Sequence, residues 1–200
     1  QASKLRMLAP AIGKFSFSAR PVRKNLQIRA QILSSIRRFF ESNSFLEVET
    51  PLLVTSPGME PNLTAFETSC RTEVRNRKLY LSPSPEYAMK RLLATGLEKI
   101  YQISKAFRDE SIGSLHNPEF TLLEWYRAYA DYGTIMADAE KLIYGLGQEI
   151  TGSSYLHFRD RKVDLTPPWE RMTVREAMVY YSGIQVDPDE DLNAFILEAQ

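Results

Sequence analysis

Apolar residues recur at helical spacing in two long parts of the sequence. In the first part, a helix is predicted to begin at Pro21 and to end at Asn43 and Ser44, and its apolar positions are Ile28, Ile32, Leu33, Ile36, Phe39 and Phe40. In the second part, residues 131–150 predict another amphipathic helix, and its apolar face consists of Ile135, Ala139, Leu142, Ile143 and Leu146.

The residues between these two helices follow a pattern of short strands. Residues 45–51 predict a strand that Pro51 stops, because proline cannot donate to a strand ladder. Residues 55–78 are rich in proline and polar side chains, which predicts a loop with one or two short strands. A further strand is predicted at 79–82.

A third helix follows this strand after a turn. Ser84 suits the N-cap of the helix, Pro85 its first position and Gly96 its end. Glu86 then lies in the first turn, where a carboxylate stabilises the helix through the dipole by about 0.3–1 kcal/mol.

The last part of the sequence predicts a hairpin and two helices. Residues 155–165 predict the hairpin. Thr173 and Glu176 match the capping box of a helix over 174–183, and a final helix is predicted near Leu192.

The composition is typical of one domain with a sizeable core. The sequence has 200 residues, of which 44% are hydrophobic and 25% are charged. Its single cysteine, Cys70, can form no internal disulfide, which fits a reducing cytosol, and we expect a structural thiol. There is no apolar run of about 18 residues and no charged-then-apolar leader, so we expect a cytoplasmic protein without a membrane partner.

The net charge of +0 is unevenly distributed along the chain. The other 160 residues carry 16 basic and 25 acidic side chains, a net charge of −9, whereas the first forty have no acid and nine basic residues: Lys4, Arg6, Lys14, Arg20, Arg23, Lys24, Arg29, Arg37 and Arg38. We expect residues 1–20 to form a basic arm, which suits an RNA or an acidic protein as partner. A solvated segment followed by a helix face accounts for the same charges equally well.

The candidate chemistry lies in residues 107–127, which read as two strands joined by a polar loop. Alternation along a strand places every second side chain on the same face. If the strands pair, one face carries Arg108, Glu110, Phe120, Leu122, Glu124 and Tyr126. The opposite face carries Phe107, Asp109, Leu123, Trp125 and Arg127, of which Leu123 and Trp125 are predicted to join the core.

The polar face of this hairpin predicts a binding site. Unpaired charges lose several kcal/mol on desolvation, so we expect the face to line a cavity. The Arg108 guanidinium offers a fork for a phosphate and Phe120 a flat surface for a ring. Carboxylates accept hydrogen bonds from amino groups. Together these groups predict a nucleotide and a cationic amine.

The sequence FRDE, followed by HNPEFTLLEWY, resembles motif 2 of the class II aminoacyl-tRNA synthetases in its lysyl form. The continuation EWYR is closer still to a short relative, the elongation factor P–lysine ligase. Motif 2 would span about 101–127, and the helix and strand over about 26–51 resemble motif 1, which builds the dimer interface in this family. A plain core helix with an edge strand fits the second pattern equally well.

The resemblance implies a fold and a domain boundary. Residues 21–200 would form the N-terminal part of a class II catalytic domain, which has an α/β fold in the broad sense (α+β), with an antiparallel sheet flanked by helices. A homodimer through motif 1 is expected.

The resemblance also implies an ATP site. Arg108 would hold the α-phosphate and act as the catalytic residue, while Glu110 would accept from the adenine amino group and Phe120 would stack on adenine. The implied ATP-binding set is Arg108, Asp109, Glu110, His116, Asn117 and Phe120. Asp109 stands where lysine-type relatives commonly have asparagine. A solvated His116, and an Arg108–Glu110 ion pair worth well under 1 kcal/mol, are the plain alternatives.

The implied lysine-binding residues are Ser84, Glu86, Glu124 and Tyr126. Glu86 would take the α-amino group of the substrate, and Glu124 would lie near its side-chain ammonium. These two acids argue against an aspartate- or asparagine-specific enzyme, because they suit a substrate with two amino groups.

The activity implied by the resemblance is ATP-dependent activation of lysine or β-lysine to the aminoacyl-adenylate, a reaction that needs positioning and charge neutralisation. Because only about twenty-five residues precede motif 1, the expected acceptor is a lysine of elongation factor P. The alternative is tRNA, as in a lysyl-tRNA synthetase.

Both ends of the sequence look cut, and no counterpart of motif 3 is present. We expect the motif 3 arginine and the Mg²⁺ ligands in a missing C-terminal part and no metal site in these residues. A degenerate, catalytically inactive synthetase-like binding module is the rival hypothesis.

Overall fold

The computed structural model describes residues 19–58, 60–71, 75–110, 113 and 116–199. The basic arm predicted at 1–20 lies almost entirely outside these described residues. The chain divides into two compact units, Gln1–Leu165 and Thr166–Gln200, and each is described by itself.

The first unit contains an antiparallel pair of strands, β5 (Lys99–Phe107) and β6 (Glu119–Arg127). Their register pairs Gln102 with Glu124 and Ala106 with Phe120. The short strand β1 (Leu46–Glu47) joins β5 in parallel, which gives the order β1-β5-β6. The predicted α/β fold with antiparallel strands is confirmed. The sequence predicted a strand at the position of β1 but did not indicate its parallel pairing with β5.

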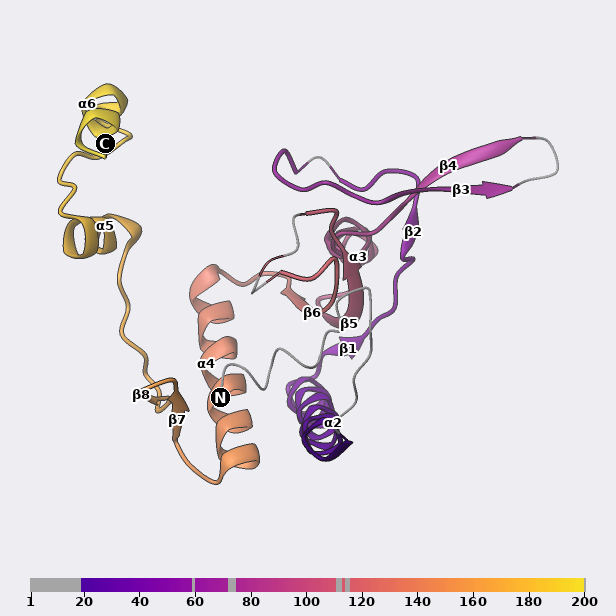
Figure 1. The fold of residues 1–200 in the computed structure, drawn as a ribbon, viewed down its shortest axis with the longest axis horizontal. Coiled ribbons are helices and arrows are strands. Elements are labelled where there is room, and N and C mark those ends of the chain that lie inside the picture. Colours follow the sequence, from indigo (N-terminus) through magenta and orange to yellow (C-terminus); the bar gives the residue numbers. More distant parts are fainter. Residues whose placement is uncertain (1–18, 59, 72–74, 111–112, 114–115, 200) are drawn as a thin grey trace. The chain divides into compact units, whose positions relative to one another are not determined.

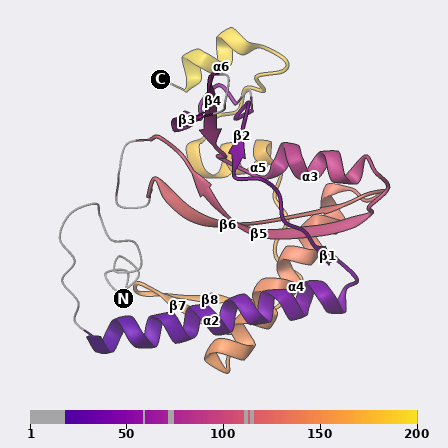
Figure 2. The same cartoon turned by 90° about the vertical axis from the view of Figure 1, so that its right-hand side faces the viewer.

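Helices cover both faces of this sheet (Figures 1 and 2). Helices α2 (Ala19–Ser42) and α4 (Tyr132–Thr151) contact each other on one side, and α3 (Glu86–Leu93) contacts β5 on the other (Figure 2). Asp131 caps α4 by accepting from the backbone nitrogen of Thr134 at 2.9 Å. Helices α2 and α4 lie where the apolar pattern predicts them, and α3 lies within the range that its cap and stop residues predicted.

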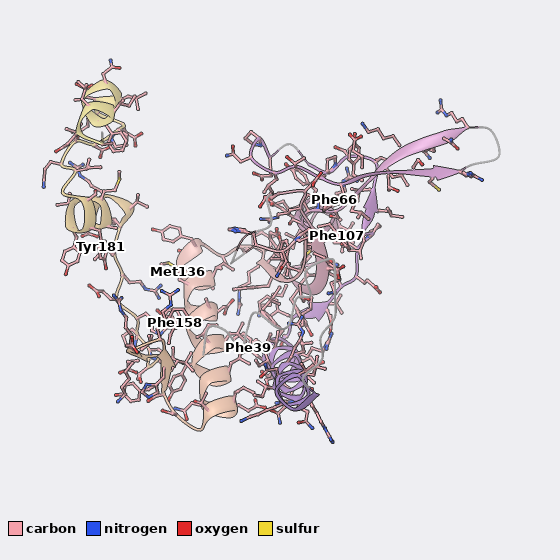
Figure 3. All side chains as sticks on the ribbon, in the orientation of Figure 1. Phe39, Phe66, Phe107, Met136, Phe158 and Tyr181 are labelled. Atoms are coloured by element: carbon pink, nitrogen blue, oxygen red, sulfur yellow. The ribbon has the colours of Figure 1, made fainter. Side chains whose placement is uncertain are left out.

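An aromatic cluster forms the core between β5–β6 and α2. Phe40 is fully buried, stacks on Tyr101 with ring centroids 4.5 Å apart, and meets Trp125 at 5.6 Å. Leu123 and Trp125 pack against this cluster, as the alternation predicts, together with Phe39 of α2, which is labelled in Figure 3. Burial of these aromatic rings stabilises this face of the hairpin.

A buried ion pair closes the same face at the end of β6. The Arg127 guanidinium donates to both carboxylate oxygens of Asp138, at 2.6 and 3.0 Å, and lies 4.8 Å from the Phe45 ring centroid. The Asp138 side chain is only 6% exposed. Removal of one partner would leave a buried charge alone, which makes such a pair strongly structural.

A second, smaller sheet has the antiparallel order β2-β4-β3. Its strands are β2 (Leu53–Val54), β3 (Glu67–Arg71) and β4 (Asn76–Leu81). The prediction of one or two short strands within 55–78 is confirmed, although β4 begins at Asn76 and not at 79. Cys70 lies in β3 with an exposed side chain.

Two predicted strand boundaries are wrong. Strand β5 ends at Phe107, so Arg108 to Glu110 do not continue the first strand of the hairpin. The backbone nitrogen of Arg108 still donates to the carbonyl of Pro118 at 2.9 Å, whereas that of Asp109 donates to the carbonyl of Thr64 at 2.8 Å. Likewise, the strand predicted at 45–51 is limited to β1.

The first unit ends in the predicted hairpin, β7 (Tyr155–Phe158) and β8 (Arg161–Asp164). The second unit contains α5 (Val174–Ser182) and α6 (Leu192–Glu198), neither of which has a buried residue. The capping box of α5 is confirmed, with reciprocal hydrogen bonds between Thr173 and Glu176. Among the described residues, no helix combines the length and the apolar character needed to cross a membrane.

Candidate functional site

The candidate site is the face of β5–β6 that lies opposite the aromatic core. Directly paired residues share a face, so Phe120, Glu124 and Tyr126 lie on one side of the sheet. Residues two apart along a strand are separated by about 6.7 Å. The face thus has an acidic end at Glu124 and an aromatic end at Phe120, next to which Arg108 leaves β5.

Arg108 and Phe120 are brought together at the aromatic end. The guanidinium carbon lies 5.1 Å from the Phe120 ring centroid, and Nε donates to the carbonyl of Pro83 at 3.4 Å. Arg108 is half-buried, and its two Nη groups form the fork that suits a phosphate. The guanidinium thus lies over one face of the Phe120 ring.

Glu124 is held at both carboxylate oxygens by neutral hydroxyl groups. The Tyr126 hydroxyl donates to Oε1 at 2.7 Å, and the Ser84 hydroxyl donates to Oε2 at 2.8 Å. Burial, and then the hydrogen bond to Glu124, raise the pKa of the Tyr126 phenol well above its usual range. The phenol therefore stays a donor, and the Glu124 lone pairs that the two hydroxyl groups do not use can accept from a cationic partner.

Glu86 lies near Glu124 but is engaged on its own helix. Its Oε1 is 2.5 Å from Nζ of Lys90, one turn further along α3, and this hydrogen bond raises the pKa of Lys90. Negative charge from both Glu86 and Glu124 contributes to the raised pKa of Tyr126, which shows that the two acids act on the same part of the face. The role of Glu86 toward an α-amino group stays a prediction.

Ser84 was predicted to be the N-cap of α3, which is wrong by one residue. Pro85 occupies the N-cap with φ −75° and ψ −2°, and α3 begins at Glu86. Pro85, whose backbone dihedral angles are already helical, takes the N-cap position one residue after Ser84. The Ser84 hydroxyl nevertheless accepts from the backbone nitrogen of Glu86 at 3.1 Å. The serine thus satisfies the helix start and reaches Glu124 at the same time.

The other predicted ATP-binding residues are less closely gathered. Asp109, His116 and Asn117 are exposed, and Glu110 is half-buried. Between them, residues 111–112 and 114–115 lie outside the described part of the chain. Within that described part, no hydrogen bond or ion pair joins Arg108 to any of these four residues, so their roles stay predictions.

Gln102 belongs to the site face and was missed by the sequence analysis. It is buried, lies directly across from Glu124, and its Oε1 accepts from the hydroxyl of Thr50 at 3.0 Å. Counting the alternation back from Arg108 along β5 would have placed it there. Gln102 is therefore the strand neighbour of Glu124 on the site face.

The described residues do not fit a bound Mg²⁺. Among them, no group of three or more His, Cys, Asp or Glu side chains is arranged to hold a metal ion. Glu86 and Glu124 are occupied by Lys90 and by two hydroxyl groups.

Comparison with known proteins identifies related chains. A family model described as tRNA synthetases class II (D, K and N) matches residues 15–196. The lysine–tRNA ligase of Nostoc punctiforme is 38% identical over 177 residues, which cover 87% of this chain and 29% of the relative. The lysine–tRNA ligase of Syntrophomonas wolfei is 39% identical over 166 residues, or 82% of this chain and 33% of the relative. That of Histophilus somni is 37% identical over 173 residues, or 86% and 34%. The chain thus spans about a third of the length of these curated relatives.

Proposed function

Because the chain belongs to the class II tRNA synthetases of the D, K and N group, we propose that the protein activates lysine with ATP and transfers the lysyl group to tRNA. The three relatives described above are named lysine–tRNA ligases, which favours tRNA over the elongation factor P lysine that the EWYR sequence suggested. The test described below also covers β-lysine as the substrate and elongation factor P as the acceptor.

One observation carries the choice of substrate. The Glu124 side chain is half-buried, and its two oxygens accept from neutral hydroxyl groups. The nearby Lys90 is paired with Glu86, and no ion pair to Glu124 is found among the described residues. A partly buried negative charge attracts an ammonium group and repels the carboxylate side chain of aspartate. Of the three amino acids in the family description, lysine alone has a cationic side chain.

Arg108 supplies the complementary charge at the other end of the site. In the proposed reaction, the lysine carboxylate oxygen attacks the α-phosphorus of ATP. The bond from this phosphorus to the oxygen bridging to the β-phosphate breaks, and pyrophosphate leaves with the electron pair. No proton has to move, so the protein contributes positioning and neutralisation of charge. Arg108 would bind the α-phosphate through its Nη groups while Nε stays at the Pro83 carbonyl, and Phe120 would stack on adenine.

We also propose a homodimer formed through α2 and β1. Leu26 on α2 and Leu46 in β1 are each 52% exposed, and Leu53 of β2 is exposed to the same extent. Exposed apolar side chains on α2 and β1 suit a covered interface. Sedimentation of the full-length protein tests the assembly state.

The test of function is ATP–pyrophosphate exchange with the full-length protein, with lysine, β-lysine and aspartate supplied separately. We expect exchange with lysine, followed by transfer of labelled lysine to tRNA and not to elongation factor P. If exchange occurs but the labelled lysine appears on elongation factor P and not on tRNA, then elongation factor P is the acceptor. A folded protein that exchanges with none of the three amino acids would be a binding module.

A matched pair of substitutions ties this activity to the site. Glu124→Gln removes the charge and should raise the lysine KM by about tenfold or more, as expected for loss of a charged hydrogen bond. Glu119→Gln, in the same strand but on the opposite face, removes only an exposed pair with Lys105 and should leave the KM unchanged. Equal effects of the two changes would contradict the assignment of Glu124.

A further inference from the structure

A short segment, residues 82–85, connects the two ends of the site. Three successive carbonyls of this segment accept hydrogen bonds. That of Ser82 accepts from the nitrogen of Phe107 at 3.0 Å, that of Pro83 from Nε of Arg108 at 3.4 Å, and that of Ser84 from the hydroxyl of Ser82 at 2.7 Å. Figure 3 labels Phe107, the last residue of β5, at which this attachment begins.

The segment has little conformational freedom of its own. Pro83 and Pro85 alternate with the serines, and each proline ring fixes φ near −65°. Both prolines and Ser82 are buried. The segment is therefore a short, stiff connection that touches Arg108 at one point and Glu124 at the next residue.

The Ser84 hydroxyl both accepts and donates a hydrogen bond. Its oxygen accepts from the nitrogen of Glu86 at 3.1 Å, and its single hydrogen points to Oε2 of Glu124 at 2.8 Å, because an ionised carboxylate can only accept. No donor remains on this hydroxyl for a substrate carboxylate. With Tyr126 bound to Oε1, both oxygens of Glu124 have fixed positions.

We propose that the segment 82–85 is a spacer that fixes the distance between the Glu124 carboxylate and the Arg108 guanidinium, and that Ser84 is a positioning residue. This replaces the sequence-based assignment of Ser84 as a lysine-binding residue, and it rests on the proposed function. A fixed spacing selects amine substrates by length, since the ammonium must reach Glu124 while the carboxylate stays at the phosphate held by Arg108. The spacer thereby distinguishes lysine from ornithine, which is one methylene shorter.

The experiment compares Ser84→Ala and Ser84→Thr with the wild type in ATP–pyrophosphate exchange, using the full-length protein and both lysine and ornithine. One methylene is commonly discriminated about 10- to 200-fold. Ser84→Ala should raise the lysine KM about tenfold, leave the ATP KM unchanged and remove most of the preference for lysine. Ser84→Thr keeps the hydroxyl and should restore all three values.

Ser84→Gly covers the case in which the alanine variant fails to fold, because glycine is well tolerated at helix starts and also lacks the hydroxyl. A folded Ala or Gly variant with an unchanged lysine KM and an unchanged lysine-to-ornithine ratio overturns the inference. So does an equal loss with both amino acids, which would indicate a purely structural role. Absence of exchange in the wild type is a different result, because it overturns the proposed function itself.

Discussion

The two faces of the β5–β6 pair each present a tyrosine that donates to a glutamate, but the glutamates have different surroundings. On the core face, the Tyr101 hydroxyl donates to Glu47 at 2.9 Å, and Nε of Arg37 lies 3.1 Å from both oxygens of that carboxylate. On the site face, Tyr126 donates to Glu124, whose other partner is the neutral Ser84. Glu47 therefore forms an ion pair within the protein, whereas Glu124 forms none among the described residues and is, in our proposal, available to a ligand.

This difference shows how one hairpin separates stability from function. Alternate residues of the same strands point to opposite faces, so a substitution at one position affects the core and a substitution at the next affects the site. The core face buries aromatic side chains and a closed ion pair. The site face keeps charges that lack a full set of partners, which is unfavourable for the empty protein and favourable for binding.

The largest effect is expected from Phe40→Ala. The ring is fully buried and contacts Tyr101, Phe45 and Trp125, so its loss should lower the free energy of unfolding by about 3–5 kcal/mol. Phe120→Ala, on the site face, removes a half-buried ring and should lower it by less than half as much. Urea unfolding of both variants checks this order, and equal losses would contradict the separation of the faces.

Arg108→Ala should lower the activity strongly and the stability only slightly. Loss of a group that neutralises developing charge typically lowers the rate about 10²- to 10³-fold, whereas the lost contact with Phe120 stabilises the fold by only about 0.5–1 kcal/mol. Pyrophosphate exchange and urea unfolding measure the two effects.

Arg37→Ala is the matched control for this change. It removes an arginine from the core side of the sheet, where its ion pair with Glu47 is substantially exposed. Its effect on stability should be under about 1 kcal/mol, with no effect on exchange. A loss of exchange in Arg37→Ala comparable to that in Arg108→Ala would show that the two arginines are not functionally distinct.

The sequence predicted the helices, the hairpin and its two faces because these features depend on local periodicity. Leu123 and Trp125 were placed in the core, and Glu124 and Tyr126 on the polar face, by alternation alone. The capping box at Thr173 followed in the same way from local hydrogen bonding.

The features that sequence missed depend on contacts between distant segments. The parallel pairing of β1 with β5 joins residues more than fifty positions apart, and the bond from Ser84 to Glu124 spans forty. Just past the early end of β5, Asp109 forms a hydrogen bond with Thr64. No periodic pattern encodes these pairings, so only the structure could reveal that Ser84 holds Glu124.

The two tyrosines provide a smaller and more closely matched test. Tyr101→Phe should lower the free energy of unfolding by about 1 kcal/mol, the usual contribution of one hydrogen bond, and leave the lysine KM unchanged. Tyr126→Phe removes a bond of the same kind but should raise the lysine KM several-fold, because Glu124 loses one of its two supports. If Tyr101→Phe raises the lysine KM as much as Tyr126→Phe does, the comparison between the faces is wrong.

The smallest expected effect is one in which the two faces behave alike. Burial raises the pKa of both Tyr101 and Tyr126, and in each case a hydrogen bond to a glutamate adds to the shift. In the unfolded chain a tyrosine ionises near pH 10, so the stabilisation is fully present below that pH and is lost as the pH rises above it. Either phenylalanine variant should therefore lose less stability than the wild type between about pH 9 and about pH 11 in urea unfolding. A flatter alkaline decline in only one of the variants would mean that the other phenol already ionises freely in the folded protein.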